Sequence, residues 1–168
     1  FETMPDYTIV ENRLKNLAHP DLRFYTVGHI HGYAFYRLLL GKPAPSKPNI
    51  LLTAGVHGDE PAGVEAILQF LERDPTDVLN RSHILVLPCV NPSGYANDTR
   101  ENIKGEDINR AFNDEVPEST LVKQQLSGRR FNIFLDMHED YDATGTYFYE
   151  GQRDKKWLAP SIAQEAKK

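Results

Sequence analysis

The stretch ILLTAGVHGDEPAG, residues 50–63, decides the fold. Its opening run, residues 50–54, is apolar on both faces, which is typical of a strand buried in a parallel sheet. Residues 62–72 then predict an amphipathic helix, because one stripe of the segment is apolar. That stripe consists of Val64, Ile67, Leu68 and Leu71. A buried strand that leads into such a helix is the basic unit of α/β proteins.

Further elements follow on the C-terminal side of this unit. Apolar runs at residues 84–87 and 131–137 predict two more buried strands, and residues 146–149 predict a fourth. Residues 161–168 are consistent with a helix that begins near a proline. Between them, residues 91–113 are polar and rich in turn formers, so we expect a long functional loop there.

The N-terminal side predicts a helix and a hairpin. Residues 7–19 carry apolar side chains at helical spacing. Residues 23–30 and 33–40 are rich in aromatic, aliphatic and β-branched residues and are separated by a turn that contains Gly32, which indicates a β-hairpin. We therefore predict an α/β fold with a mixed, largely parallel central sheet flanked by helices, and with the hairpin at one edge.

Composition limits the class of protein. The chain has 168 residues, of which 40% are hydrophobic and 26% are charged, and this fits one globular domain spanning residues 1–168. A formal net charge of −5 disfavours nucleic acid as a partner. Neither a long apolar run nor a basic run is present, so no contact with a membrane is expected. No signal peptide is visible, which favours a cytoplasmic location.

Polar clusters follow three of the predicted strands. These clusters are GVHGDEPAG (residues 55–63), PCVNPSGY (residues 88–95) and HED (residues 138–140). Ligands of open α/β sheets bind beyond the carboxyl ends of the strands. We therefore expect the chemistry of this protein where the three clusters converge.

Two histidines and a glutamate in these clusters indicate a metal site. His57 and Glu60 are three residues apart at a strand-to-helix junction, and His138 closes a strand. Two imidazoles and one carboxylate suit a catalytic zinc ion, because they leave a coordination position open for water. Asp136 faces the same side of its strand as His138 and could orient it.

Four ordered motifs carry a family resemblance. GVHGDEPAG, VNPSGY, TRENIKGEDINRAF (residues 99–112) and a histidine at a strand end together resemble the zinc carboxypeptidases of the M14 type, which include the related succinylglutamate desuccinylase and aspartoacylase branch. The resemblance covers about residues 50–138. It implies a zinc-carboxypeptidase-like catalytic domain that holds one zinc ion.

The resemblance also assigns roles to individual residues. It places the zinc ligands at His57, Glu60 and His138, and it places the grip on a substrate carboxylate at Asn109 and Arg110. A guanidinium fork matches a carboxylate bidentately, which agrees with that role.

Two further roles follow from the same motif. Arg100 matches the arginine that polarises the scissile carbonyl and stabilises the oxyanion. Asp107 matches the aspartate that supports the first zinc histidine.

Other candidates have simpler explanations. His29 and His31 alternate along the hairpin and could chelate a metal, but an ordinary place at an edge turn explains them as well. Cys89, the single cysteine, is expected to be buried and inert. Ser93 is expected to be a turn residue.

The general base is not secure. Glu150, just after the predicted strand at residues 146–149, is the better candidate within the chain, and Glu139 is the weaker one. Otherwise the base lies beyond Lys168. The late strands expected for this fold are also missing, so we expect the domain to be C-terminally incomplete and to hydrolyse peptides poorly by itself.

The leading prediction is a zinc-dependent metallocarboxypeptidase. Its substrate would be a small peptide with a free carboxylate, cleaved at the C-terminal amide bond. A zinc-dependent deacylase of N-acyl amino acids would use the same site. A non-catalytic metal- or ligand-binding module is the third alternative, and the sequence leaves the oligomeric state open.

Overall fold

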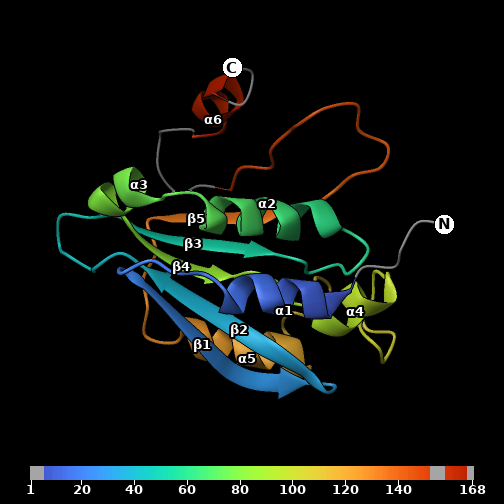
Figure 1. Cartoon of the computed structure of the whole chain (residues 1–168). Coiled ribbons are helices and arrows are strands. Elements are labelled where there is room, and N and C mark those ends of the chain that lie inside the picture. Colours follow the sequence, from blue (N-terminus) through green and yellow to red (C-terminus); the bar gives the residue numbers. More distant parts are fainter. Residues whose placement is uncertain (1–5, 152–157, 166–168) are drawn as a thin grey trace.

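A computed structural model describes residues 6–151 and 158–165. Strands in this part of the chain are β1 (Leu22–Ile30), β2 (Tyr33–Leu40), β3 (Asn49–Ala54), β4 (His83–Leu87) and β5 (Ile133–Met137). Helices are α1 (Tyr7–Lys15), α2 (Pro61–Glu72), α3 (Thr76–Arg81), α4 (Pro92–Asn97), α5 (Pro117–Leu126) and α6 (Ala159–Glu165). Figure 1 shows their arrangement around one twisted sheet. No helix among the described residues is both long enough and apolar enough to cross a bilayer.

The strands form one mixed sheet in the order β1-β2-β4-β3-β5. The β1–β2 and β2–β4 pairs are antiparallel, whereas β3 pairs in parallel with both β4 and β5. The predicted mixed sheet with a hairpin at one edge is therefore confirmed, but two strand pairs are antiparallel and two are parallel, so the sheet is not largely parallel as expected. Parallel pairing is confined to β3, β4 and β5, whose carboxyl ends lie at the same edge of the sheet.

A two-residue turn closes the hairpin between β1 and β2. His31 and Gly32 both have positive φ angles, 51° and 90°, and Ile30 pairs with Tyr33 across the turn. Two positive φ angles in sequence are the mark of a type I′ turn, which matches the twist of antiparallel strands. The glycine between the two predicted strands therefore lies in the turn, as expected.

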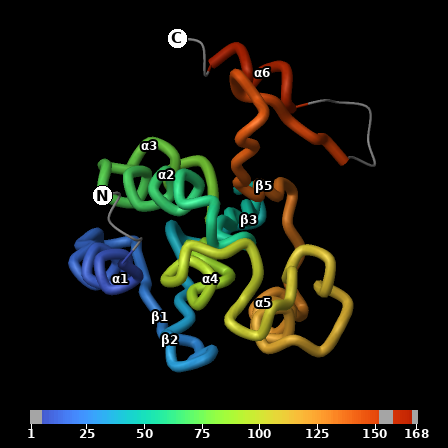
Figure 2. Tube along the Cα trace, turned by 90° about the vertical axis from the view of Figure 1, so that its right-hand side faces the viewer, coloured from blue at the N-terminus to red at the C-terminus, as the bar shows by residue number. Residues whose placement is uncertain are grey.

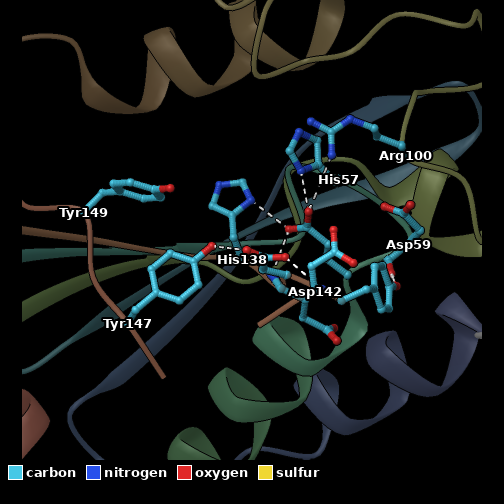
Figure 3. Close-up of a pocket in the computed structure, with 11 residues that line it drawn as sticks. His57, Asp59, Arg100, His138, Asp142, Tyr147 and Tyr149 are labelled. Carbon is cyan, nitrogen blue, oxygen red and sulfur yellow. Dashed lines mark hydrogen bonds and ion pairs between the residues drawn. The ribbon is translucent and has the colours of Figure 1, made fainter. Parts of the chain in front are cut away.

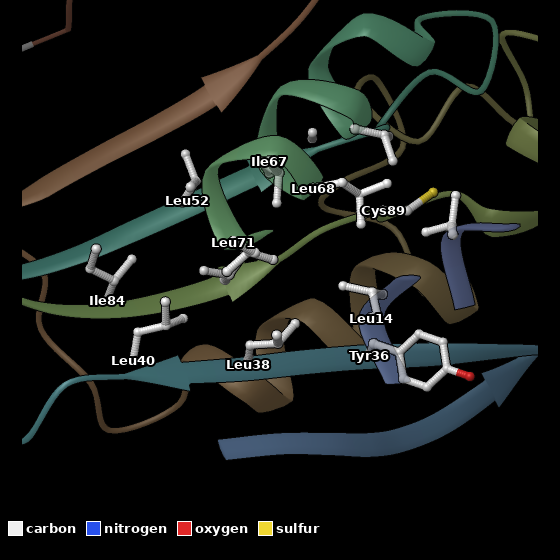
Figure 4. Close-up of a cluster of buried hydrophobic side chains, with 14 of the residues drawn as sticks. Leu14, Tyr36, Leu38, Leu40, Leu52, Ile67, Leu68, Leu71, Ile84 and Cys89 are labelled. Carbon is white, nitrogen blue, oxygen red and sulfur yellow. The ribbon is translucent and has the colours of Figure 1, made fainter. Parts of the chain in front are cut away.

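Apolar side chains cover both faces of the sheet. Helices α1 and α2 lie on one face, where Leu14 and Ile67 pack with Leu38 and Leu52 of the strands (Figure 4). Helix α5 lies on the other face, where its residue Val122 belongs to a second buried cluster. Strands between two apolar layers are buried on both sides, which explains the near-continuous apolar runs of β3 and β4.

The connection from β3 to α2 is tightly packed. Gly55 has a φ of +64°, a conformation that favours glycine. A Cβ atom on Gly58 would lie 1.9 Å from the carbonyl carbon of Gly94, so the loop approaches α4 too closely for any side chain. Pro61 occupies the first turn of α2, where a missing N–H costs nothing.

Three helices were not predicted. Helix α4 lies within residues 91–113, which are therefore not one continuous loop, and α3 and α5 lie outside every predicted element. Helix α3 has six residues, too few for a period of 3.6 to be recognised. In α5, polar residues interrupt the apolar stripe.

The C-terminal part of the predicted sheet differs from expectation. Strand β5 begins at Ile133 and is half-exposed rather than buried, because it is the edge strand, and Phe134 is 59% exposed. Residues 146–149 do not form a strand. The segment after β5 leaves the sheet and leads towards α6 (Figure 2). Helix α6 is where a helix was expected, and residues 166–168 of that prediction lie outside the described part.

Candidate metal centre and active site

His57, Glu60 and His138 meet at the carboxyl edge of the parallel strands. His57 and Glu60 belong to the β3–α2 connection, and His138 follows β5. Nδ1 of His57 lies 2.7 Å from Oε1 of Glu60, and Nδ1 of His138 lies 2.7 Å from Oε2 of the same carboxylate. The structure therefore brings together the three residues that the sequence analysis predicted as metal ligands.

This group has the donor set of a zinc site. One ligand atom from each of the three residues lies within 4.8 Å of the other two. His57 and Glu60 are buried, whereas His138 is at the surface. Two imidazole nitrogens and one carboxylate oxygen, with one side open, fit a zinc ion that retains a water ligand.

The close approach of His138 and Glu60 shifts the pKa of both side chains. Hydrogen bonds to Asp136 and Glu60 raise the pKa of His138 to about 10. Burial raises the pKa of Glu60, but hydrogen bonds from His138 and His57 outweigh it and hold the pKa below its usual value. A metal would have to displace the proton from His138, because only a deprotonated imidazole is a ligand.

A carboxylate lies beside the second nitrogen of each histidine. Nε2 of His138 is 3.1 Å from Oδ2 of Asp136, and Nε2 of His57 is 3.4 Å from Oδ1 of Asp107. The hydroxyl of Thr53 donates to Oδ1 of Asp136 across the β3–β5 pair. Such outer carboxylates fix ring orientation in metal sites. The sequence analysis considered both aspartates but missed Thr53, whose role depends on strand register.

Arg100 joins the cluster through Asp107. Its Nε donates to Oδ2 of Asp107 at 3.1 Å, and its guanidinium reaches within 3.8 Å of Oε1 of Glu60. Burial raises the pKa of Asp107, but hydrogen bonds from the Arg110 backbone and the Arg100 side chain outweigh it and lower that pKa. Asp107 therefore stays charged and links His57 to Arg100.

A buried carboxylate holds the loop that carries Arg100 and Asp107. The side-chain amide of Asn102 donates to both oxygens of Glu118, each at 3.2 Å, and Glu118 is fully buried on α5. The Asn102 carbonyl oxygen Oδ1 accepts from the backbone N–H groups of Lys104 and Glu106. Sequence reasoning missed Glu118, because nothing in the pattern of α5 separates it from a surface glutamate.

The predicted carboxylate grip lies outside the cluster. Asn109 and Arg110 are both exposed, with 84% of the Arg110 side chain open to solvent. Nε of Arg110 is 3.5 Å from Oδ2 of Asp107, so the residue is next to the site without lining its pocket.

A pocket of about 430 Å³ opens in front of the cluster. His57, His138 and Arg100 lie on one side of it, and Tyr147 and Tyr149 lie on the other (Figure 3). The hydroxyl of Tyr147 donates to Asp140 at 2.5 Å, which raises the pKa of Tyr147 to about 12. These two tyrosines, left without a role by the sequence, therefore form a wall of the pocket.

The two candidate bases have other partners. Glu139 lines the pocket, but its Oε1 accepts from the backbone N–H of Ala62 at 2.5 Å, in the first turn of α2. Glu150 lies away from the pocket lining, and its carboxylate accepts from the backbone N–H groups of Leu158 and Ala159. The structure thus brings Glu139, and not Glu150, to the site.

The remaining candidates lie elsewhere. Cys89 is free and buried, and burial raises the pKa of its thiol, as expected of an inert cysteine. Ser93 is buried at the start of α4, where its hydroxyl accepts from the backbone N–H of Ile103. His29 is exposed, whereas Nε2 of His31 lies 3.5 Å from Oε1 of Glu118.

The comparisons with known proteins fit the M14 family, and the fold is carboxypeptidase-like. A family model for the succinylglutamate desuccinylase/aspartoacylase catalytic domain matches residues 46–159. The chain therefore belongs to the succinylglutamate desuccinylase/aspartoacylase catalytic domain family.

Known relatives agree with this membership. The chain is 31% identical to carboxypeptidase E of Caenorhabditis elegans over 122 residues, which is 60% of this chain and 26% of the relative. It is 41% identical to murein peptide amidase A of Escherichia coli K12 over 70 residues, which is 42% of this chain and 28% of the relative. The chain thus spans little more than a quarter of the length of these two curated relatives.

A solved structure extends the similarity to most of the chain. A protein assigned as a metallopeptidase from Shewanella amazonensis superposes with a TM-score of 0.71 at 27% identity. The superposition covers 94% of this chain and 63% of that one. The named relatives are hydrolases that act on amide bonds.

Proposed function

We propose that this protein is a zinc-dependent metallocarboxypeptidase that hydrolyses the amide bond next to a free C-terminal carboxylate. The observation that carries the proposal is the convergence of His57, Glu60 and His138 with Arg100 at one pocket. Carboxypeptidases and a peptide amidase among its relatives support an amide substrate.

His57, Glu60 and His138 would hold the metal. A zinc ion there would lower the pKa of a bound water and polarise the scissile carbonyl. Asp136 and Asp107 orient the two imidazoles from behind, so that the ligand nitrogens point to the same place.

Arg100 would stabilise charge on the carbonyl oxygen. Its guanidinium is near Glu60 at the pocket and is fixed by Asp107, so its donors are already oriented when the oxyanion develops. Fixed donors of this kind stabilise a transition state more than the ground state, since they need no reorganisation.

Asn109 and Arg110 would bind the substrate carboxylate. Both lie exposed on the turn that also carries Asp107. Arg110 has a long, solvated side chain that can turn towards a carboxylate at the pocket mouth. A bidentate guanidinium–carboxylate pair would then set the position of the scissile bond.

A deacylase of N-acyl amino acids is the second candidate. The match to the succinylglutamate desuccinylase/aspartoacylase model favours it. Such a substrate also offers an amide bond beside a free carboxylate, so the same residues would serve it.

Hydrolysis of matched substrates by the zinc-loaded protein distinguishes these functions. We expect slow cleavage of dipeptides with a free C-terminal carboxylate, because no general base is secure in this chain, and still slower cleavage of the same dipeptides with a C-terminal carboxamide. A higher kcat/KM for N-acyl amino acids would establish the deacylase instead. Zinc and product binding without any turnover would contradict both and indicate a binding module.

A further inference from the structure

A second pocket, of about 300 Å³, opens at the opposite end of the sheet. Asn49 and His83 line it, and they are the first residues of β3 and β4. The candidate metal centre follows the carboxyl ends of β3 and β5, and the two pockets share no lining residue. This second pocket is called the basic pocket below.

Three arginines from separate parts of the chain line the basic pocket. Arg23 comes from β1, and Arg129 and Arg130 come from the connection between α5 and β5. Among the residues that the structure describes, none of the three guanidinium groups has a carboxylate within 4.0 Å. Such a cluster is unexpected in a chain whose net charge is −5, because the chain has many carboxylates and a carboxylate beside each arginine would stabilise the positive charge.

A buried histidine forms part of the pocket wall. His83 is 9% exposed, and its Nδ1 lies 3.3 Å from Oδ1 of Asn49. Burial lowers the pKa of His83, and the positive charges of Arg129, Arg23 and Lys47 lower it further. A polar side chain is thus buried where several cations act on it together.

The arginine side chains are suited to bind a ligand. Nε of Arg129 donates to the backbone oxygen of Gln125 at 2.9 Å, which holds this guanidinium in place at the end of α5. Leu39, Leu85 and Phe131 supply apolar surface beside the charges. Arginine forks bind oxyanions bidentately, and an adjacent apolar wall favours a ligand that carries a hydrophobic group.

We propose that the basic pocket is a binding site for the oxyanion group, phosphate or carboxylate, of a small organic ligand. Arg23, Arg129 and Arg130 bind the anion, and the apolar wall packs against the rest of the ligand. The site is separate from the hydrolytic centre, so the proposal does not depend on the proposed function.

The imidazole resonances of His83 report on this site directly. They are assigned with a His83→Gln variant and followed by NMR while inorganic phosphate, phenyl phosphate or succinate is added. We expect the bound anion to raise the pKa of His83, because it offsets the neighbouring positive charges. A response to the phosphates alone assigns a phosphate ligand, and a response to succinate alone assigns a carboxylate. No response of His83 to any of the three anions would overturn the proposal.

Matched variants test the arginines. Arg129→Gln and Arg23→Gln should each weaken binding of the responding anion about tenfold or more, because each removes a charged hydrogen-bond donor. Arg73→Gln is the control, because Arg73 is exposed at the end of α2. This substitution changes the net charge by the same amount as the other two. Arg23 is exposed too, so its variant is expected to fold even where Arg129→Gln does not. Equal affinity in Arg23→Gln and Arg73→Gln would contradict the assignment.

Discussion

Glu60 contacts both imidazoles of the candidate metal centre, although it occupies the N-cap position of α2. A cap residue ordinarily uses its side chain to accept from the first turn of the helix, and Glu60 does not. Glu139 accepts from Ala62 in that turn instead. Because Glu139 accepts the hydrogen bond from the first turn of α2, the carboxylate of Glu60 is free to face His57 and His138 in the site.

Arg100 should contribute more to the binding of a transition-state analogue than to the binding of the product. We expect Arg100→Ala to weaken a phosphonate dipeptide analogue, which mimics the tetrahedral oxyanion, by about 100-fold. Product affinity and zinc content should change little, because neither requires the oxyanion contact. Calorimetry on the zinc-loaded variant measures both affinities. Equal losses for analogue and product would show that Arg100 only holds the ground state.

Replacement of Arg110 by lysine tests whether carboxylate binding needs the guanidinium fork or only a positive charge. We expect Arg110→Lys to cost about 1.5–3 kcal/mol in binding a free-carboxylate product, because lysine keeps the charge but not the fork. Calorimetry with the free-carboxylate product and its carboxamide provides the comparison, since the carboxamide should bind both proteins alike. Unchanged carboxylate affinity would remove Arg110 from the grip.

At the scale of elements, the loop at residues 100–110 depends on α5. Glu118 and Asn102 are buried together, so removal of the carboxylate deletes two of the hydrogen bonds that hold this loop and leaves the Asn102 amide only the Glu106 side chain as a partner. We expect Glu118→Ala to lower the free energy of unfolding by about 1–3 kcal/mol. Glu115→Ala is the control, because Glu115 is exposed just before the same helix. Denaturant unfolding measures both, and equal stability of the two variants would contradict this role.

Helices α1 and α2 are joined by Arg13, which pairs with Glu65 and Glu72. Hydrogen bonds from Arg13 lower the pKa of both glutamates. A carboxylate with a lowered folded-state pKa stabilises the fold above its unfolded pKa of about 4.3, and this contribution is lost as pH falls through the folded value.

Replacement of Arg13 should therefore destabilise the protein in a pH-dependent way. We expect Arg13→Gln to lower the free energy of unfolding by about 1 kcal/mol at neutral pH, since the ion pairs are partly exposed. The difference from wild type should shrink in acid, when the glutamates are protonated. Unfolding curves across pH measure this, with Arg73→Gln as the charge-matched control. A difference that is constant with pH would show that Arg13 acts through packing alone.

Elements with strong periodicity were predictable, and weakly patterned ones were not. The hairpin, β3, α2 and β4 follow directly from apolar patterns, because α2 buries one stripe and β3 and β4 are buried on both faces. Helix α5 rests on contacts that lie far away in sequence, such as that between Glu118 and Asn102. Residues 146–149 are β-branched and aromatic, as in many strands, but β5 does not pair with them, and Tyr147 instead bonds to Asp140.

For the whole molecule, the sheet places its chemistry at one edge. The three metal-ligand candidates could be read from the sequence, since each follows a strand whose carboxyl end lies at that edge. Supporting contacts such as Thr53 with Asp136 could not, because they depend on the register between β3 and β5. Strand β5 is the edge of the sheet among the described residues, and its Phe134 side chain is exposed there.

Zinc binding to the purified protein tests the central claim most directly. Elemental analysis and competition with a chelator are applied to the wild type and to His57→Ala, Glu60→Ala and His138→Ala, with His29→Ala as the control on the distant hairpin. We predict about one zinc ion per chain in the wild type and in His29→Ala, and a large loss of zinc affinity in the other three. Undiminished zinc in those three variants, or a loss confined to His29→Ala, would contradict the account.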